Sequence, residues 1–568
     1  MIRLLPDWLR DYRREWLAGD LSAGVLVTLL LVPQGLAYAL LAGLPPQFGL
    51  YASLAPLLIY AVLGQGRAQS VGPMAVTSLL VAASLSRLAE PGSGDYLALA
   101  VGLAVLSGLI LLALGFARLG FMADFLSQPV LAAFTSASAL IILLSQLSAL
   151  AGVRGGASLP ALATGLWQGL PKANGLALAF GAATLAFLTL ARRFGQPLLQ
   201  VLGLSAARAV LWVRCAPTLA VAVSMLLVSG WGLTGRLPLV GEVPAGLPGL
   251  RWPALEAGQW ADLLLPAFFI GLINYVQSLS VAQMLAARRG EQIDPDRELL
   301  ALGACNIGSG LCGGFPITGG LTRSVVNADA GAQSQLSSLI TAFGMALAML
   351  FAAGALATLP LSVLAATIIS AVAGMVRLDA LRLAWRSDKA DAAAWLLTFL
   401  LVLLLGVDSG IVAGMAVSLA ALLWRGSRPH IAELGRVPGT QHFRNRLRHA
   451  VEGLPGVLTL RVDESLYFAN ARQVRLALIG KAAGMPSCRQ LVLVMSAVNR
   501  IDTTALLMLE ELDRTLAERG IVLHLAEVKG PVMDVMERAG LGRRFAGRTH
   551  LSLQQAWQRL TPSPDYHI

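Results

Sequence analysis

The segment Gly303–Ala332 reads GACNIGSGLCGGFPITGGLTRSVVNADAGA and lies among long apolar stretches, so we expect it at membrane depth. It holds seven glycines between Gly303 and Gly320, together with Pro316. Each glycine costs a helix about 1 kcal/mol and each proline about 3 kcal/mol, so the segment cannot form one continuous helix. Irregular backbone is tolerated at that depth only where protein buries it or where it lines a polar cavity.

We therefore predict two half-helices separated by an extended break at Gly313–Gly320, with the second beginning near Leu321. Thr322, Arg323 and Ser324 would occupy its first turn. Free backbone N–H groups and the positive end of the helix dipole would then face the break and form an anion site. The alternative is a glycine-rich helix-packing seam with a proline kink. The coincidence of proline, polar residues and arginine favours the broken helix.

The composition indicates a polytopic membrane protein. Of the 568 residues, 56% are hydrophobic and only 13% are charged, whereas soluble domains carry about 25% charged residues. The net charge of +11 comes almost wholly from arginines. These cluster in short loops between apolar stretches, which membrane topology explains better than nucleic-acid binding does. The four cysteines form no Cys-x-x-Cys or Cys/His cluster, so we expect no metal, no disulfide framework and no cofactor.

Fourteen apolar stretches follow a basic N-terminal segment, 1–19, which we expect to be an interfacial helix. They lie near 20–42, 47–64, 72–88, 95–116, 124–150, 175–192, 214–232, 262–286, 299–312, 321–331, 335–357, 361–375, 390–406 and 408–424. Several are shorter than the roughly 20 residues that a crossing helix needs, which predicts half-helices or oblique packing. With fourteen spans in a membrane domain over 20–424, the arginine-rich loops all fall on one side, and both termini are cytoplasmic.

The membrane domain also shows one sign of an internal repeat. Gln34 lies in the first apolar stretch and Gln277 in the eighth. Each is followed 39 residues later by a proline in a glycine-containing break, Pro73 or Pro316. Seven spans per half would invert one half relative to the other, as in many transporters. A single matched spacing in a chain rich in glycine and proline is also compatible with chance.

The composition changes after Trp424. Residues 425–455 are predicted to be a basic, polar linker, and 456–568 a cytoplasmic α/β domain. We expect strands at 457–462, 464–470, 490–496 and 521–528, and helices at 471–483, from near Ala505 onward and at 531–539. Strands that alternate with helices predict a small sheet with helices packed on it.

Taken together, these segments resemble the sulfate permease family, also called solute carrier family 26. LVPQGLAYALLAGLPPQFGLYAS resembles that family's opening signature, and SVGPMAVTSLL, FLSQPVLAAFTSASALII and GGFPITGGLTRSVVN are similar to its later motifs. The C-terminal part resembles a STAS domain, the family's usual cytoplasmic tail. The resemblance implies an α-helical membrane domain of fourteen spans, built as a seven-plus-seven inverted repeat with core and gate subdomains. It also implies a homodimer.

The resemblance further implies an anion site between half-helices of the third and tenth spans. Carried over residue by residue, the site would consist of Gln34, Tyr38, Gly72, Met74, Gln277, Gly320, Thr322 and Arg323. Arg323 would supply a fixed charge, Gln34 an amide donor, and the backbone near Met74 further donors. Gln34 has an alternative role in an interhelical hydrogen bond, and Tyr38 an alternative role in packing.

Gln277 departs from the family pattern. Many bacterial relatives carry a glutamate or aspartate there, linked to proton or sodium coupling, whereas a glutamine takes up no proton. No Asp, Glu or His lies in the middle of an apolar stretch; Asp20, Asp124, Glu298, Asp329 and Asp408 all fall near ends or breaks. The protein is therefore uncoupled, or an anion exchanger, or altered at this residue to mimic a protonated acid.

In the STAS-like part, Thr504 stands where small STAS regulators have a phosphorylated hydroxyl residue. Capping of the following helix by Asp502 or Thr503 is the simpler interpretation of this motif.

These observations predict a secondary active transporter of small anions in the bacterial plasma membrane, and the family resemblance implies that it works by elevator-like motion. Sulfate, bicarbonate, a related anion or a dicarboxylate would suit the site. An anion channel, or an anion sensor that signals through its STAS domain, is the alternative on this scaffold. Nucleobase transporters share the architecture, but Arg323 argues for an anion. No nucleophile–base pair or metal constellation is visible, so we do not expect an enzyme.

Overall fold

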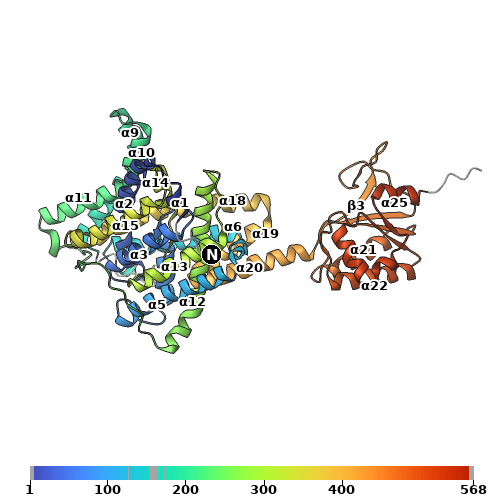
Figure 1. Cartoon of the computed structure of the whole chain (residues 1–568), viewed down its shortest axis with the longest axis horizontal. Helices are drawn as coiled ribbons and strands as arrows, with labels where there is room; N and C mark the ends of the chain where they lie inside the picture. Colours follow the sequence, from blue (N-terminus) through green and yellow to red (C-terminus); the bar gives the residue numbers. More distant parts are fainter. Residues whose placement is uncertain are drawn as a thin grey trace, which may run out of the picture. The chain divides into compact units, whose positions relative to one another are not determined.

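The computed structural model describes residues 6–125, 127–152, 164–165, 167–169, 171 and 173–561. The chain folds into two compact units, Met1–Ser418 and Leu419–Ile568. The first is built almost entirely of helices and the second of a sheet with helices (Figure 1).

Helices account for nearly all of the first unit. Their bounds are α1 Asp7–Arg10, α2 Leu17–Leu41, α3 Gln47–Leu63, α4 Ala75–Leu85, α5 Gly94–Phe116, α6 Gln128–Leu150, α8 Gly175–Leu190, α9 Gln196–Val201, α10 Ala206–Arg214, α11 Ala216–Gly230, α12 Ala257–Ala287, α13 Pro295–Leu311, α14 Leu321–Asp329, α15 Leu336–Leu347, α16 Ala353–Leu356, α17 Leu361–Val372, α18 Leu378–Ser387, α19 Lys389–Leu405 and α20 Val407–Ser427. Each predicted apolar stretch coincides with one of these helices or with a consecutive run of them. Within the described part of the chain, seven helices are long and apolar enough to cross a membrane. The count of fourteen crossings therefore stays a prediction.

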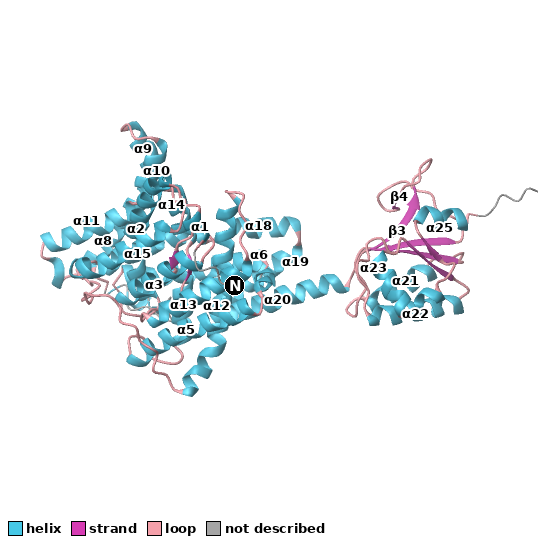
Figure 2. Cartoon of the chain, in the orientation of Figure 1, coloured by secondary structure: helices cyan, strands magenta, loops and turns pink. Residues whose placement is uncertain are grey.

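Two short strands lie among these helices and appear in magenta in Figure 2. β1 (Val71–Gly72) pairs antiparallel with β2 (Thr318–Gly319). β1 precedes α4 and β2 precedes α14, so the order helix, helix, strand, helix occurs twice in the unit. Because α13 ends at Leu311 and α14 begins at Leu321, the predicted break in the helix is confirmed.

The matched spacing in the sequence does not mark equivalent positions. Pro73 follows β1, whereas Pro316 precedes β2. The repeated order of elements supports two related halves, but the inversion of one half relative to the other stays a prediction.

The glycines before the break serve close helix packing. A Cβ atom on Gly303 of α13 would lie 2.9 Å from the carbonyl oxygen of Gly108 on α5, and one on Gly308 would lie 2.2 Å from Cδ1 of Ile59 on α3. Small residues allow such approach where hydrocarbon surrounds the helices. The segment therefore combines both interpretations, with a packing seam up to Leu311 and a break after it.

The second unit is a six-stranded sheet in the order β4–β3–β5–β6–β7–β8. Its strands are β3 Ile431–Arg436, β4 Phe443–Asn445, β5 Val457–Val462, β6 Gln490–Val494, β7 Val522–Ala526 and β8 Thr549–His550, and its helices are α21 Ala471–Ala483, α22 Thr503–Glu518, α23 Gly530–Arg538, α24 Leu541–Arg544 and α25 Leu553–Leu560. β5 to β8 run parallel, and β3 is antiparallel to both of its neighbours. Alternate residues of β6 face opposite layers: Leu491 and Leu493 pack with α21 to α24, and Val492 and Val494 with α25.

Two strands lie inside the segment 425–455 that the sequence indicated as a linker. Only Ala432, Leu434 and Gly435 of β3 are buried, and β4, at the edge of the sheet, has no buried residue. This apolar alternation is too short to stand out in a basic stretch.

The strand expected at 464–470 is wrong. Asn470 holds this stretch as a turn, because its Oδ1 accepts the Tyr467 N–H (3.0 Å) and its Nδ2 donates to the Ser465 carbonyl (2.8 Å). Asparagine side chains favour such local bonds over a strand ladder.

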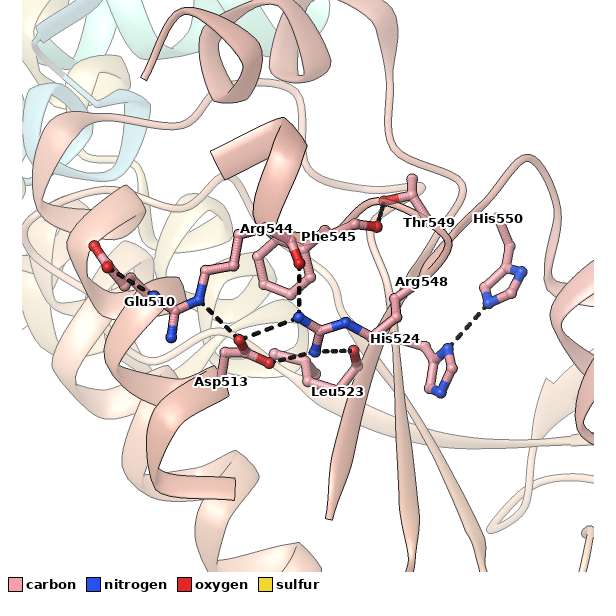
Figure 3. Close-up of polar contacts among 9 residues, drawn as sticks. All are labelled: Glu510, Asp513, Leu523, His524, Arg544, Phe545, Arg548, Thr549 and His550. Carbon is pink, nitrogen blue, oxygen red and sulfur yellow. Dashed lines mark hydrogen bonds and ion pairs between the residues drawn. The ribbon is translucent and has the colours of Figure 1, made fainter. Parts of the chain in front are cut away.

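An ion cluster joins α22 to the end of the sheet (Figure 3). Asp513 is only 6% exposed and accepts bonds from Arg544 Nε (2.9 Å) and Arg548 Nη1 (2.6 Å). Burial alone would raise the pKa of Asp513, but the bonds from Arg548 and Arg544 hold that pKa below its ordinary value. Beside the cluster, the buried rings of His524 and His550 stack, with Nδ1 and Nε2 3.1 Å apart.

Candidate functional site

Two helix N-termini begin at the β1–β2 pair. Met74 is the N-cap of α4, and Gly320 is the N-cap of α14. The Met74 side chain makes no capping bond, and Gly320 has no side chain to make one. The first N–H groups of an α-helix have no partner within the helix, and the dipole makes this end positive. The strand pair thus brings two positive helix ends to one place in the bundle.

The start of α14 is held rigidly by the segment before β1. The Gly320 N–H donates to the Ser70 carbonyl (2.9 Å), and the Ser70 N–H donates to Ser324 Oγ (2.9 Å). Within the break, the Ile317 N–H donates to Asn306 Oδ1 (2.9 Å). These bonds replace the helical ladder where the backbone is extended, as buried polar groups require.

Arg323 lies in the first turn of α14 and is 2% exposed. Its Nη1 donates to the Pro73 carbonyl (2.7 Å) at the start of α4. Its Nε and Nη2, which form one edge of the guanidinium, have no hydrogen-bond partner among the described residues. A buried, unsatisfied charge is costly, and this edge can hold an oxyanion through two parallel N–H bonds. The arrangement is therefore suited to an anion.

The glycines predicted for the site lie against this guanidinium. A Cβ atom on Gly320 would be 2.9 Å from Arg323 Nη2, and one on Gly72 would be 3.3 Å from it. A side chain at either position would therefore compete with the guanidinium for space.

A cavity of about 140 Å³ opens beside the first turns of α14. Gln34 and Tyr38 of α2 line it together with Thr322 of α14. The opposite wall comes from α8, α11 and α17, through residues such as Leu188, Pro217 and Thr367. The cavity thus lies between two groups of helices, one of which carries both broken segments.

Arg192 and Arg214 also line this cavity, and the sequence analysis did not single them out. Arg214 Nη2 pairs with Asp329 Oδ2 at the end of α14 (2.6 Å), and Arg192 Nη1 donates to the Ser370 carbonyl (2.6 Å). Both arginines belong to one basic loop, which could have indicated a functional cluster, but membrane topology alone is enough to explain the positive charge of that loop.

Of the predicted site residues, only Gln34, Tyr38 and Thr322 line the cavity. Gly72, Met74, Gly320 and Arg323 lie at the strand pair and the two helix starts, outside this lining. Gln277 is partly exposed on α12 and is also outside the lining. Its neighbours Asn274 and Ser278 face the strands instead: Thr318 Oγ1 donates to the Asn274 carbonyl (2.6 Å), and Asn274 Oδ1 accepts from Thr77 (2.7 Å). Two polar residues four apart share a helix face, and this spacing was the signal that the sequence analysis missed.

Thr504 lies at the start of α22 and is exposed. Asp502 Oδ1 accepts the Ala505 N–H (2.8 Å), so the predicted cap is confirmed. Phosphorylation of Thr504 stays a prediction.

The profile of the Sulfate permease family matches residues 17–398. The chain belongs to the sulfate permease family. A second profile, the STAS domain, matches residues 448–556 of this family member. The chain is 35% identical over 545 residues to the "probable sulfate transporter" of Mycobacterium tuberculosis, covering 94% of this chain and 93% of that protein. It is 33% identical over 584 residues to "Sulfate transporter 4.1, chloroplastic" of Arabidopsis thaliana, covering 99% and 84%.

Solved structures agree with this assignment. The murine solute carrier 26 family member A9 anion transporter, in its inward-facing state, superposes with a TM-score of 0.89 at 26% identity, covering 98% of this chain and 94% of that one. The transmembrane domain of a cyanobacterial bicarbonate transporter shares the fold, with a TM-score of 0.59 at 21% identity over 72% of this chain and 98% of that one. This sulfate permease family member is therefore a multi-pass membrane protein of an anion transporter family, with a C-terminal STAS domain.

Proposed function

We propose that this protein is a secondary active transporter of small anions in the plasma membrane. The observation that carries the proposal is Arg323, buried where two helix N-termini meet, with its Nε and Nη2 edge unpaired among the described residues. Two positive helix ends and a fixed guanidinium favour a negative ligand. The names of the relatives, sulfate transporters and an anion transporter, support the same class of substrate.

The anion is held between the N-termini of α4 and α14. Gln34, Tyr38 and Thr322 face it from the cavity, and backbone N–H groups near Met74 complete its shell. Sulfate, bicarbonate, a related anion or a dicarboxylate suits a site built from a guanidinium edge and helix dipoles. Gln277, outside the cavity, belongs to the site only if α12 contributes in another conformation.

Transport proceeds by elevator-like motion. The helices that carry the broken segments form the moving core and slide against a gate that includes α8, α11 and α17. The support for this division is the position of the cavity, which α2 and α14 line on one side and these three helices on the other. The protein acts as a homodimer with both termini in the cytoplasm, as the family resemblance and the basic loops favour.

Flux into proteoliposomes tests this function. Uptake of radiolabelled sulfate, with bicarbonate, chloride and dicarboxylates as competitors, is expected to saturate with concentration. Strict dependence on an anion inside the vesicle would identify an exchanger, whereas conductive, unsaturable flux would identify a channel. Binding without any flux would overturn the transporter proposal in favour of a sensor.

A further inference from the structure

Glu298 is a fully buried carboxylate that the proposed anion site does not use. It lies near the start of α13 with 0% of its surface exposed. Side chains from three other segments donate to it: Ser278 Oγ (2.9 Å), Gln69 Nε2 (3.2 Å) and Tyr60 OH (3.0 Å). These three partners are neutral. A buried carboxylate costs several kcal/mol of lost hydration, so a position with such partners calls for a role.

Two of these partners connect Glu298 to β2. A Cβ atom on Gly319 would lie 2.4 Å from Gln69 Nε2 and 2.8 Å from Ser278 Oγ. Gln69 Nε2 also donates to Ser278 Oγ (2.6 Å). Glu298, Gln69 and Ser278 therefore form a closed hydrogen-bonded triad packed directly against the strand.

Gln69 continues the connection to α14. The next residue, Ser70, accepts the Gly320 N–H and donates its own N–H to Ser324 Oγ, each at 2.9 Å. Gly320 and Ser324 bracket the first turn of α14, which carries Arg323. The position of Gln69 thus affects where this helix begins.

We propose that Glu298 is a positioning residue for the anion site. Its carboxylate fixes the amide of Gln69 and the hydroxyl of Ser278 against β2, and thereby holds the first turn of α14 in the geometry that binds the anion. This inference rests on the proposed function, because it assigns the site at α14 to an anion.

The orientation of Gln69 shows why an acceptor is needed at 298. Its Nε2 faces Glu298 and Ser278, and its buried Oε1 has no partner in the described part of the chain. A glutamine at 298 keeps one acceptor oxygen and replaces the other with an N–H donor group, whose hydrogen bond the Oε1 of Gln69 could accept after the Gln69 amide flips. The hydrogen bonds would be rearranged rather than broken, so the protein should still fold.

An exchange of the two side chains tests the proposal. Glu298→Gln places two amides in contact, Gln69→Glu places two carboxylates in contact, and the double variant restores one of each. We expect each single variant to raise the KM for radiolabelled sulfate in proteoliposomes about fivefold or more, while the maximal rate changes less than about twofold. The double variant should recover most of the affinity. Glu90→Gln, at an exposed position between α4 and α5, is the matched control and should keep the KM unchanged.

Hydrogen exchange at residues 318–324 gives a readout that does not depend on transport. Exchange there should be faster in Glu298→Gln and should return toward the unmodified rate in the double variant. If the unmodified protein carries no sulfate, the proposed function fails for that anion, and the exchange result still decides the role of Glu298. Single variants with unchanged KM and unchanged exchange would overturn the proposal, and so would a double variant worse than both. If Glu298→Gln does not insert, Ser278→Ala, which removes one donor without changing a charge, should produce the same rise in KM and exchange.

Discussion

Replacing Arg323 with lysine separates the charge of the proposed anion site from its geometry. Lysine keeps the positive charge but presents one ammonium group in place of the two-nitrogen edge formed by Nε and Nη2. At least one charge-assisted hydrogen bond to the anion is then lost, which corresponds to about 1.5–3 kcal/mol. Each 1.4 kcal/mol is tenfold, so Arg323→Lys should weaken anion binding by about 10- to 100-fold.

Arg323→Ala removes both bonds and the charge, and should weaken binding by about 100-fold or more. It also removes a buried charge whose only hydrogen-bond partner among the described residues is the Pro73 carbonyl. The anion-free variant should therefore melt no lower than the unmodified protein, because the loss of an uncompensated buried charge offsets the loss of packing. What should disappear is the rise in melting temperature that a bound anion produces.

Scintillation-proximity binding of radiolabelled sulfate to purified protein measures the affinities. Thermal melting with and without sulfate measures the rise in melting temperature that bound sulfate produces. Gel filtration confirms that each variant is folded. A well-folded Arg323→Ala protein with unchanged affinity would refute the assignment. A lysine variant that binds as tightly as the unmodified protein would show that charge alone matters and that the guanidinium edge does not.

Three further outcomes are expected. Transport by the unmodified protein should not depend on a proton or sodium gradient, because Gln277 cannot ionise. The variant Gln277→Glu should introduce pH dependence. Strong acceleration of the unmodified protein by an inward proton gradient would contradict this prediction. Deletion from residue 428 onward removes β3 and β4 with the rest of the sheet, and should leave a membrane-inserted protein with reduced transport. A full-length protein that runs as a monomer in mild detergent would argue against the proposed homodimer. Burial, followed by the charges of His550 and Arg548, lowers the pKa of His524 from 6.5, its value in the unfolded chain, to about 4. The folded protein therefore has its full stability above pH 6.5, where His524 is neutral in both states, and loses stability as the pH falls. At pH 5 His524 should cost the STAS domain about 2 kcal/mol, measurable as faster hydrogen exchange in β7 and β8. His524→Leu should reduce this pH effect, and His550, whose pKa is also lowered by burial, should leave a remainder.

The sequence was enough to predict the broken helix, because seven glycines and a proline in an apolar setting exclude a regular one. It also predicted that Gln34, Tyr38 and Thr322 belong together, through the family resemblance, and the structure brings all three to one cavity. It did not predict that Glu298 is buried, because the start of a helix normally faces water. That burial depends on Tyr60 and on other residues distant in the sequence.

The edge of the STAS sheet escaped prediction for a related reason. β4 has no buried residue, so its place comes only from backbone pairing with β3. The segment 464–470 has the apolar and aromatic residues that favour strands on average, so its composition predicts a strand where the structure has a turn. Only the hydrogen bonds of Asn470, which depend on the fold, decide otherwise.

The ion pair between Arg214 and Asp329 joins α10 to the end of α14. In the elevator-like motion that we propose, α14 moves with the core and the two groups separate. Their side chains are 27% and 35% exposed, and such pairs contribute about 1 kcal/mol or less. That energy biases the two conformations by at most about fivefold, so the pair cannot act as a lock. Screening of the pair by salt should therefore shift the balance between the two conformations by no more than this factor.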